Sequence, residues 1–189
     1  MFAPDYPIRT ERLLLRPIEA ADAAPMLDYK ADAENVRYVP YGPLTLAEIE
    51  ERIATRWAGT RFEKQDDAVC LAVEERESGR LVGDVVLFWR SENDREGEVG
   101  YILDPRFSGR GYAAEAVAAL LAVGFDGLGL HRIAARIDER NAASVRVVER
   151  LGFRREARLV ESSWFKGEWT TLLIYALLED EWRSSIIEG

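Results

Sequence analysis

A glycine-rich turn decides how this chain is expected to fold: Asp104-Pro105-Arg106-Phe107-Ser108-Gly109-Arg110-Gly111-Tyr112-Ala113-Ala114. Gly109 and Gly111 lack a Cβ atom, so the backbone here can adopt positive φ and approach a ligand closely. The first N–H groups of the following helix have no carbonyl partner within that helix, and together with Arg106 and Arg110 they favour an anion. The stretch predicts a phosphate-binding turn. The alternative is that the glycines only shape a connection between solvated arginines.

Hydrophobic periodicity predicts the elements around this turn. The strands that flank the glycine-turn helix need a crossover connection and should be parallel, whereas three earlier strands should form an antiparallel meander. The expected fold is one α/β (α+β) domain, residues 1–189, with a mixed, mostly antiparallel sheet, helices on both faces, and the parallel crossover at the cofactor site. Strands are expected at 12–17, 68–75, 81–89, 98–103, 131–137, 157–162 and 169–178, and helices at 19–31, 46–59, after Gly111, and at 141–151.

Composition narrows the classes of function. A net charge of −9 argues against nucleic acid as a partner and suits a cationic substrate. No apolar stretch is long enough to cross a bilayer, so a cytoplasmic protein without a membrane partner is expected. Cys70 lies in an apolar strand and His131 is the only histidine. These two residues predict no disulfide, no metal site and no acyl-enzyme.

The turn also matches a dinucleotide-binding fingerprint, Gly109-x-Gly111-x-x-Ala114, with Asp138 as a conceivable ribose partner. Its position argues against this reading, because a dinucleotide fold usually opens with its glycine turn, and here about a hundred residues rich in strand signals come first. Nor does a Lys-Ser/Thr pair follow Gly111, as a nucleoside-triphosphate loop would require. A different phosphate-bearing cofactor is indicated.

Three motifs carry a resemblance to a known family: Arg106-x-x-Gly109-x-Gly111, Asn141-x-x-Ser144 leading to Leu151-Gly152-Phe153, and the opening segment 10–17 (TERLLLRP). The chain resembles the GNAT acetyltransferases over nearly its whole length. Within them it is similar to the group that acetylates ribosomal-protein N-termini (RimJ/RimL type), although Thr170 stands where that group leads us to expect an aspartate.

The resemblance implies acetyl-CoA as the acetyl donor, an amine on a protein N-terminus or a small molecule as the acceptor, no metal, and allows a homodimer. The turn amides and the Arg106 side chain would hold the diphosphate. Pantetheine would lie along the strand that ends at residue 103, where two parallel strands splay apart and leave backbone groups free. The expected cofactor-binding residues are Ile102, Leu103, Arg106, Gly109, Arg110, Gly111, Tyr112, Ala113, Ala114 and Asn141.

Attack of an amine on a thioester needs a base for the nitrogen and a proton for the departing sulfur. Strand alternation puts Glu98, Gly100 and Ile102 on one face, which makes Glu98 the candidate base, with a solvated edge residue as the alternative. The resemblance keeps Glu98 ahead of Tyr101. It places Ser144 near the sulfur as a second catalytic candidate, although a serine in a first helical turn can also satisfy a nearby amide.

The acceptor, by the same resemblance, would be read by the connection between the first two helices and by the closing hairpin. Tyr38, Tyr41 and Trp164 are the candidate substrate-binding residues, with ordinary surface packing as the alternative. Two other classes of function stay open at this point. One is a non-catalytic acyl-CoA-binding sensor or interaction module, and the other is an NAD-linked oxidoreductase.

Overall fold

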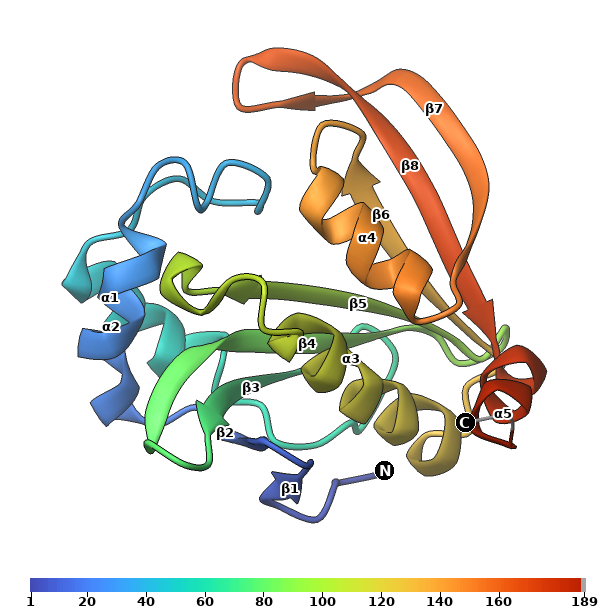
Figure 1. The fold of residues 1–189 in the computed structure, drawn as a ribbon, viewed down its shortest axis with the longest axis horizontal. Helices are drawn as coiled ribbons and strands as arrows, with labels where there is room; N and C mark the ends of the chain where they lie inside the picture. Colours follow the sequence, from blue (N-terminus) through green and yellow to red (C-terminus); the bar gives the residue numbers. More distant parts are fainter. Residues whose placement is uncertain (188–189) are drawn as a thin grey trace.

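The computed structural model describes residues 1–187 as one eight-stranded sheet with helices packed against it (Figure 1). The strands are β1 Ile8–Arg9, β2 Leu13–Pro17, β3 Ala68–Glu75, β4 Arg80–Ser91, β5 Glu96–Leu103, β6 Arg132–Asp138, β7 Arg154–Phe165 and β8 Glu168–Leu178. The α-helices are α1 Ala23–Lys30, α2 Leu46–Thr55, α3 Tyr112–Ala122, α4 Ala142–Arg150 and α5 Glu179–Ile187. Short helical turns occupy Ala20–Asp22, Pro105–Phe107 and Val123–Gly127.

The sheet is mixed and mostly antiparallel, with the strand order β1-β2-β3-β4-β5-β6-β8-β7. Among the strand pairs of residues 1–187, β5 and β6 alone run parallel, and α3 forms the crossover between them. The predicted fold class and the predicted parallel crossover are therefore confirmed. A doubly wound dinucleotide fold is excluded, because it requires a largely parallel sheet.

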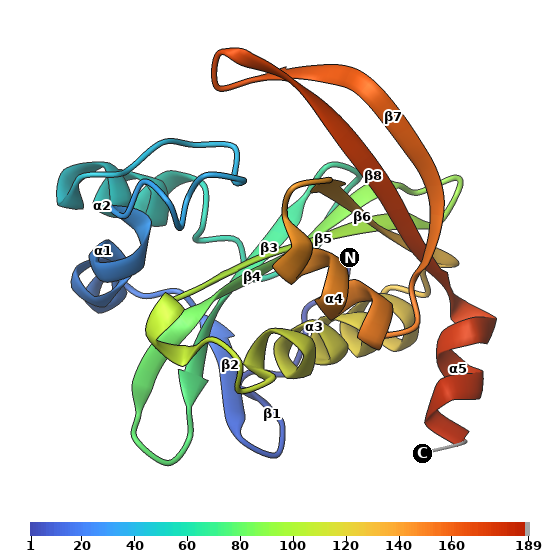
Figure 2. The same ribbon diagram turned by 45° about the horizontal axis from the view of Figure 1, so that its top comes forward.

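The two faces of the sheet carry two separate apolar clusters. Along β3, Leu71 belongs to the cluster under α3 and α4, whereas its neighbours Cys70 and Ala72 belong to the cluster under α1 and α2. This alternation follows from the two-residue period of a strand. Figure 2 shows α3 and α4 side by side on one face, well separated from the α1–α2 pair on the other.

The parallel pairing between β5 and β6 is short. It joins Glu96 to Arg132, Gly97 to Ile133 and Glu98 to Ala134, and stops there, although β5 continues to Leu103 and β6 to Asp138. Beyond Glu98 the two strands diverge, as Figure 1 shows. We call this V-shaped separation, between 99–103 of β5 and 135–138 of β6, the β5–β6 opening. It confirms the expected splay of the two strands.

Several elements differ from the sequence prediction. The helix expected at 46–59 ends at Thr55, and the strand expected from 157 begins at Arg154. Helix α5 was not predicted, because its buried face is set by a distant contact: the rings of Trp182 and Phe125 lie 5.3 Å apart. No helix within residues 1–187 combines the length and the hydrophobicity that crossing a membrane requires.

Candidate functional site

The glycine turn has the backbone geometry that its sequence predicts. Gly109 and Gly111 adopt φ of +78° and +81°, and Gly111 is the residue before the first turn of α3. In α3 the Glu115 N–H is the first to find a helical acceptor, the Gly111 carbonyl at 3.1 Å. Within residues 1–187, the N–H groups of residues 109–114 donate no hydrogen bond. The turn therefore presents a set of free donors at a helix N-terminus, which is an anion-binding arrangement.

The side chains of the predicted turn residues have different surroundings. Tyr112 is buried and its hydroxyl donates to Glu75, which also lies 3.5 Å from Arg110. Ala113 is half-buried and Ala114 is buried, and with apolar side chains their backbone amides are the donors they offer at this turn. Arg110 is about half exposed, and its guanidinium remains accessible beside the free amides.

Two further arginines lie next to Gly111, and sequence reasoning missed both. A Cβ atom placed on Gly111 would lie 3.5 Å from Nη2 of Arg12 and 3.8 Å from Nη1 of Arg150. Arg12 is paired with Glu115 at 2.6 Å, whereas Arg150 makes no ion pair within residues 1–187. Arg150 comes from the end of α4, so only the packing of α4 on α3 brings it here.

The Arg106 side chain is held by two carboxylates. Its Nε donates to Asp104 at 2.8 Å and its Nη2 to Asp28 at 2.7 Å. Burial of Asp104 opposes its ionisation, but the hydrogen bonds and charge of Arg106 outweigh burial and lower the pKa of Asp104. Arg106 thus fixes the backbone at the start of the turn. A direct contact of its side chain with phosphate stays a prediction.

Helix α4 begins beside the β5–β6 opening. Asn141 is its N-cap, with Oδ1 accepting the Ser144 N–H at 3.1 Å, so the predicted cap is present. Tyr101 of β5 donates to the Ser144 carbonyl at 3.1 Å, and burial raises the pKa of this tyrosine to about 12. Within residues 1–187 the Ser144 hydroxyl and the Asn141 Nδ2 make no hydrogen bond. Both groups are therefore free to contact a ligand.

Glu98 lies where the parallel pairing ends, on the face of β5 that is directed at α1 and α2. Ile102, four residues further along the same face, packs in the α1–α2 cluster, while Tyr101 packs on the opposite face. The Glu98 side chain is 21% exposed, and its Oε2 accepts from Arg90 Nε at 3.0 Å. It is thus a half-buried carboxylate with a defined orientation. The Leu103 carbonyl at the end of β5 accepts from Asn35 at 3.1 Å.

The three acceptor candidates do not form one cluster. Tyr38 donates to the Arg140 carbonyl at 3.4 Å. Tyr41 accepts from the buried Lys30 at 2.9 Å, and burial raises the pKa of Tyr41 to about 12. Trp164 lies near the tip of the β7–β8 hairpin, 61% exposed, with its ring 5.3 Å from that of Trp169. Tyr38 thus contacts the segment after β6, whereas Tyr41 packs against the α1–α2 cluster.

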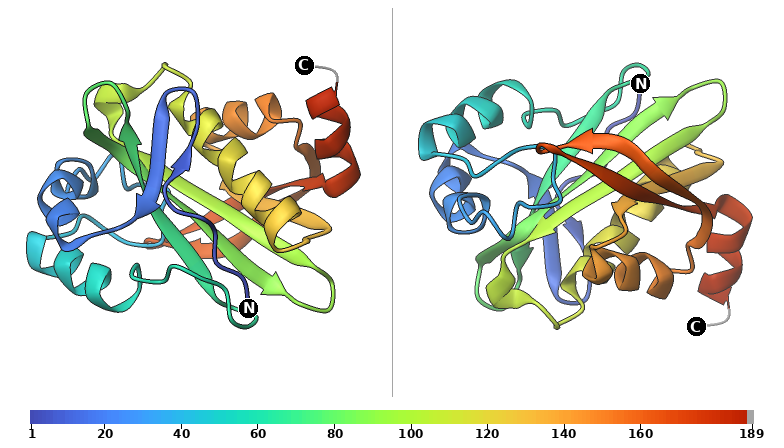
Figure 3. Two further views of the ribbon diagram at one scale, coloured as in Figure 1. Left: turned by 90° about the horizontal axis from the view of Figure 1, so that it is seen from below. Right: turned by 90° about the horizontal axis from the view of Figure 1, so that it is seen from above.

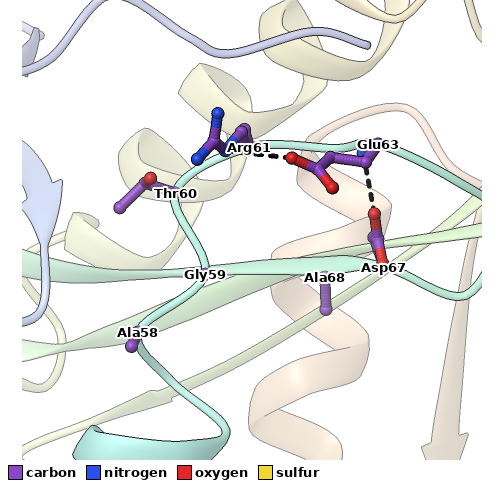
Figure 4. Close-up of a pocket in the computed structure, with 7 residues that line it drawn as sticks. All are labelled: Ala58, Gly59, Thr60, Arg61, Glu63, Asp67 and Ala68. Carbon is purple, nitrogen blue, oxygen red and sulfur yellow. Dashed lines mark hydrogen bonds and ion pairs between the residues drawn. The ribbon is translucent and has the colours of Figure 1, made fainter.

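A surface hollow between the end of α2 and the start of β3 offers no comparable chemistry (Figure 4). Its charged groups are already paired: Arg61 lies 3.2 Å from Glu63, and Asp67 accepts the N–H groups of Glu63 and Lys64 at 2.7 and 2.9 Å. These two backbone hydrogen bonds lower the pKa of Asp67. The hollow is therefore formed by a loop, and the charged side chains that line it already have partners within that loop. Within residues 1–187, no group of three or more His, Cys, Asp or Glu residues is arranged to hold a metal ion.

Comparison with known proteins identifies the class to which this fold and site belong. The sequence model of the acetyltransferase (GNAT) domain matches residues 12–154. YnaD of Bacillus subtilis (strain 168), an uncharacterised N-acetyltransferase, is 33% identical over 176 residues, which cover 93% of this chain and 99% of that protein. A crystal structure of a GNAT-family acetyltransferase from Bacillus anthracis has a TM-score of 0.82 at 30% identity, covering 96% of this chain and 100% of that one.

The same fold occurs in a spermidine N-acetyltransferase from Vibrio cholerae solved in complex with CoA and spermine, with a TM-score of 0.75 at 23% identity over 92% of this chain and 99% of that one. The family model, the match to YnaD and the Bacillus anthracis structure make the protein an acyltransferase. The chain belongs to the GNAT acetyltransferase family, whose members transfer acetyl groups from acetyl-CoA to amines.

Proposed function

We propose that this protein transfers the acetyl group of acetyl-CoA to a primary amine by direct attack, the acceptor being a protein N-terminus or a small molecule. The observation that carries the proposal is the β5–β6 opening, where pairing stops after Glu98 and Ala134. Unpaired strand edges can bind an extended ligand as an additional strand. The free amides of residues 109–114 adjoin the crossover between the same two strands and suit a diphosphate.

The residues present therefore fit acetyl-CoA. On this proposal the N–H groups of the turn, supported by Arg110 and Arg150, hold the diphosphate. The edges of β5 and β6 receive the pantetheine arm, and the free Nδ2 of Asn141 donates to it. Acetyl-CoA supplies an activated acetyl thioester, and the remaining chemistry belongs to the side chains of the chain.

Glu98 is the proposed base. It takes a proton from the acceptor ammonium, directly or through a water molecule, so that the nitrogen can form the new C–N bond while the C–S bond breaks. The Ser144 hydroxyl, which makes no hydrogen bond within residues 1–187, supplies the proton to the departing sulfur, and the second proton lost by the attacking nitrogen restores that hydroxyl. Glu98 and Tyr101 belong to opposite faces of β5, so the amine approaches from the α1–α2 face and the thiol proton arrives from the α4 face.

The names of two structural relatives support an amine as the class of acceptor. The structural relatives include the spermidine N-acetyltransferase above and a Vibrio cholerae protein provisionally named a ribosomal-protein-serine acetyltransferase, with a TM-score of 0.75 at 27% identity over 93% of this chain and 99% of that one. Both names denote amine acceptors. The net charge of −9 suits a cationic acceptor in either case.

An amine-panel assay tests the proposal. Incubation with acetyl-CoA and a panel of polyamines, amino sugars and short peptides is expected to release free CoA thiol with at least one acceptor. Cofactor binding with no thiol release from any amine would favour a non-catalytic sensor. Thermal stabilisation by a nicotinamide dinucleotide, with none by acetyl-CoA, would overturn the proposal in favour of an oxidoreductase.

Valine at Gly111 is expected to weaken acetyl-CoA binding at least tenfold, because a β-branched residue disfavours a φ of +81° and the turn would lose its shape. Gly109→Val should also weaken binding. Nothing lies within 4 Å of the Cβ added at Gly109, so the cost there comes from the backbone conformation, as at Gly111. Isothermal titration calorimetry measures both affinities. The matched control is Gly129→Val, at a glycine with φ of +65° and equally open surroundings outside the turn. Unchanged affinity in both turn variants would count against the site.

A further inference from the structure

The connection between β1 and β2 is bonded to the first turn of α3, beside the glycine turn (Figure 3, left). The Thr10 hydroxyl donates to Oε1 of Glu115 at 2.5 Å, and the Arg12 backbone N–H donates to the same oxygen at 2.8 Å. Burial opposes ionisation of Glu115, but the hydrogen bonds from Thr10 and Arg12 outweigh burial and lower the pKa of Glu115. A charged carboxylate thus joins the opening segment of the chain to the helix that begins at the glycine turn.

The Arg12 side chain reaches the turn itself. Its Nε and Nη2 lie 2.7 and 2.6 Å from Oε2 of Glu115, and its Nη1 donates to the Arg110 carbonyl at 2.9 Å. The guanidinium also lies over the ring of Tyr112, 4.9 Å from the centroid. Because Glu115 and the ring fix the plane of the guanidinium, the N–H group directed at the Arg110 carbonyl has a defined position.

Two successive peptide groups of the turn are oriented in this way. Arg12 holds the carbonyl of Arg110, and the Glu115 N–H holds the carbonyl of Gly111 at 3.1 Å. In a trans peptide the carbonyl and the next N–H point in opposite directions, and both of these peptide bonds are trans. The N–H groups of Gly111 and Tyr112, two of the turn donors that make no hydrogen bond within residues 1–187, therefore point away from these partners.

The peptide between Arg110 and Gly111 is the one that most needs such support. Gly111 adopts φ of +81°, and a glycine can reach several other backbone conformations at little cost. A rotation of this peptide would turn its carbonyl, the negative end of the peptide dipole, toward the anion site and withdraw a donor from it. The hydrogen bond from Arg12 to the Arg110 carbonyl opposes that rotation.

We propose that Arg12, held by Glu115, is a positioning residue: its bond to the Arg110 carbonyl keeps the Gly111 N–H directed at the diphosphate of acetyl-CoA. The inference rests on the proposed function and concerns the same site. The alternative is that Arg12 only adds positive charge. The two explanations predict opposite effects at Glu115, because removal of a carboxylate beside an anion site strengthens anion binding if charge alone matters.

The decisive variant is therefore Glu115→Gln. Its amide presents an NH₂ donor where the Arg12 guanidinium needs an acceptor, so the arginine loses its fixed position. We expect CoA affinity, measured by isothermal titration calorimetry, to fall about tenfold, the low end of what a hydrogen bond to a charged group contributes. Arg12→Lys keeps the charge without the planar fork and should show a similar loss. The double variant should lose no more than either single variant, because the pair acts as one unit.

The matched controls are Glu179→Gln and Arg183→Lys. Glu179 also lies in the first turn of a helix, α5, and is paired with Arg183 at 2.9 Å and with Arg95 at 3.2 Å, away from the glycine turn. Both controls should bind CoA like the wild type. All titrations are made well below the midpoint of thermal unfolding of each variant, so that a loss of affinity reports on the site and not on unfolded protein.

Steady-state kinetics give a second measurement. In Glu115→Gln and Arg12→Lys the KM for acetyl-CoA should rise, while kcat at saturating acetyl-CoA should stay within about twofold of the wild type. Absence of CoA binding to the wild-type protein would refute the proposed function. Wild-type binding of CoA that Glu115→Gln leaves unchanged or strengthens, or that Arg12→Lys leaves unchanged, would refute the positioning role of Arg12 alone.

Discussion

Replacement of Lys30 by alanine is expected to lower the free energy of unfolding by about 3–5 kcal/mol, the usual cost of leaving a buried charge without its partner. Lys30 is fully buried, and its ammonium lies 2.7 Å from Asp84 and 2.9 Å from the Tyr41 hydroxyl. Tyr29 also donates to Asp84, at 2.8 Å. The truncated protein would retain the Asp84 carboxylate in the core with only the Tyr29 hydroxyl and the Cys70 thiol as partners.

The pKa of Lys30 bears on the conditions of this measurement. Burial alone lowers it, but Asp84 and Tyr41 outweigh burial, and the net pKa lies above its usual value. A group with a raised pKa stabilises the folded state fully below its unfolded pKa and loses that contribution only as the pH rises through the folded value. The full destabilisation is therefore expected at neutral pH, and it should shrink only in strongly alkaline solution.

Urea denaturation followed by tryptophan fluorescence measures the effect. Lys64→Ala, at an exposed lysine, is the matched control and should change the free energy of unfolding by no more than about 0.5 kcal/mol. The double variant Lys30→Met with Asp84→Asn removes both charges and should recover much of the loss. A Lys30→Ala protein as stable as the wild type would show that the pair contributes nothing.

Glu98→Gln is expected to reduce kcat by about 10² to 10³-fold, the range for removal of a positioned general base. Glutamine preserves the shape of the side chain and can still accept from Arg90, so the loss would reflect the missing proton acceptor. Acetyl-CoA affinity should stay within about twofold, since Glu98 does not contact the turn, and a selective loss of kcat marks an interaction of the transition state. Steady-state kinetics and calorimetry provide the two measurements.

Glu96→Gln is the matched control for Glu98. Glu96 lies two residues earlier on β5, on the same face, and is likewise paired with an arginine, Arg132 at 2.6 Å. It lies at the opposite end of the parallel pairing, away from the β5–β6 opening. Its substitution should leave kcat nearly unchanged. Equal turnover of Glu98→Gln and the wild type across a series of pH values would remove Glu98 from the mechanism.

The parts of the site that could be predicted from the sequence are those whose signal is local. The positive φ of Gly109 and Gly111 follows from residue type at a strand-to-helix turn. The N-cap role of Asn141 follows from its place before an amphipathic run, and the face of Glu98 follows from strand alternation. The parallel crossover was predictable for a similar reason, because chain connectivity imposes it.

The partners of these residues could not be predicted, because tertiary packing supplies them. Arg150 reaches Gly111 only through the contact between α4 and α3. Lys30 stands at the C-terminal end of a short helix, where a solvated lysine interacts favourably with the helix dipole. The fold nevertheless buries it completely. Lys166 meets the carbonyls of Val36 and Arg37 across most of the length of the chain.

The placement of the lysines has a consequence for self-modification. The 25 basic residues include only three lysines, and arginine carries the remaining positive charge on a side chain that does not act as an amine nucleophile at neutral pH. Lys30 is buried in the core and the Lys166 ammonium donates to two carbonyls, whereas Lys64 is exposed and its ammonium makes no hydrogen bond or ion pair within residues 1–187. An acetyltransferase of this composition thereby exposes few side-chain amines of its own to unwanted acylation.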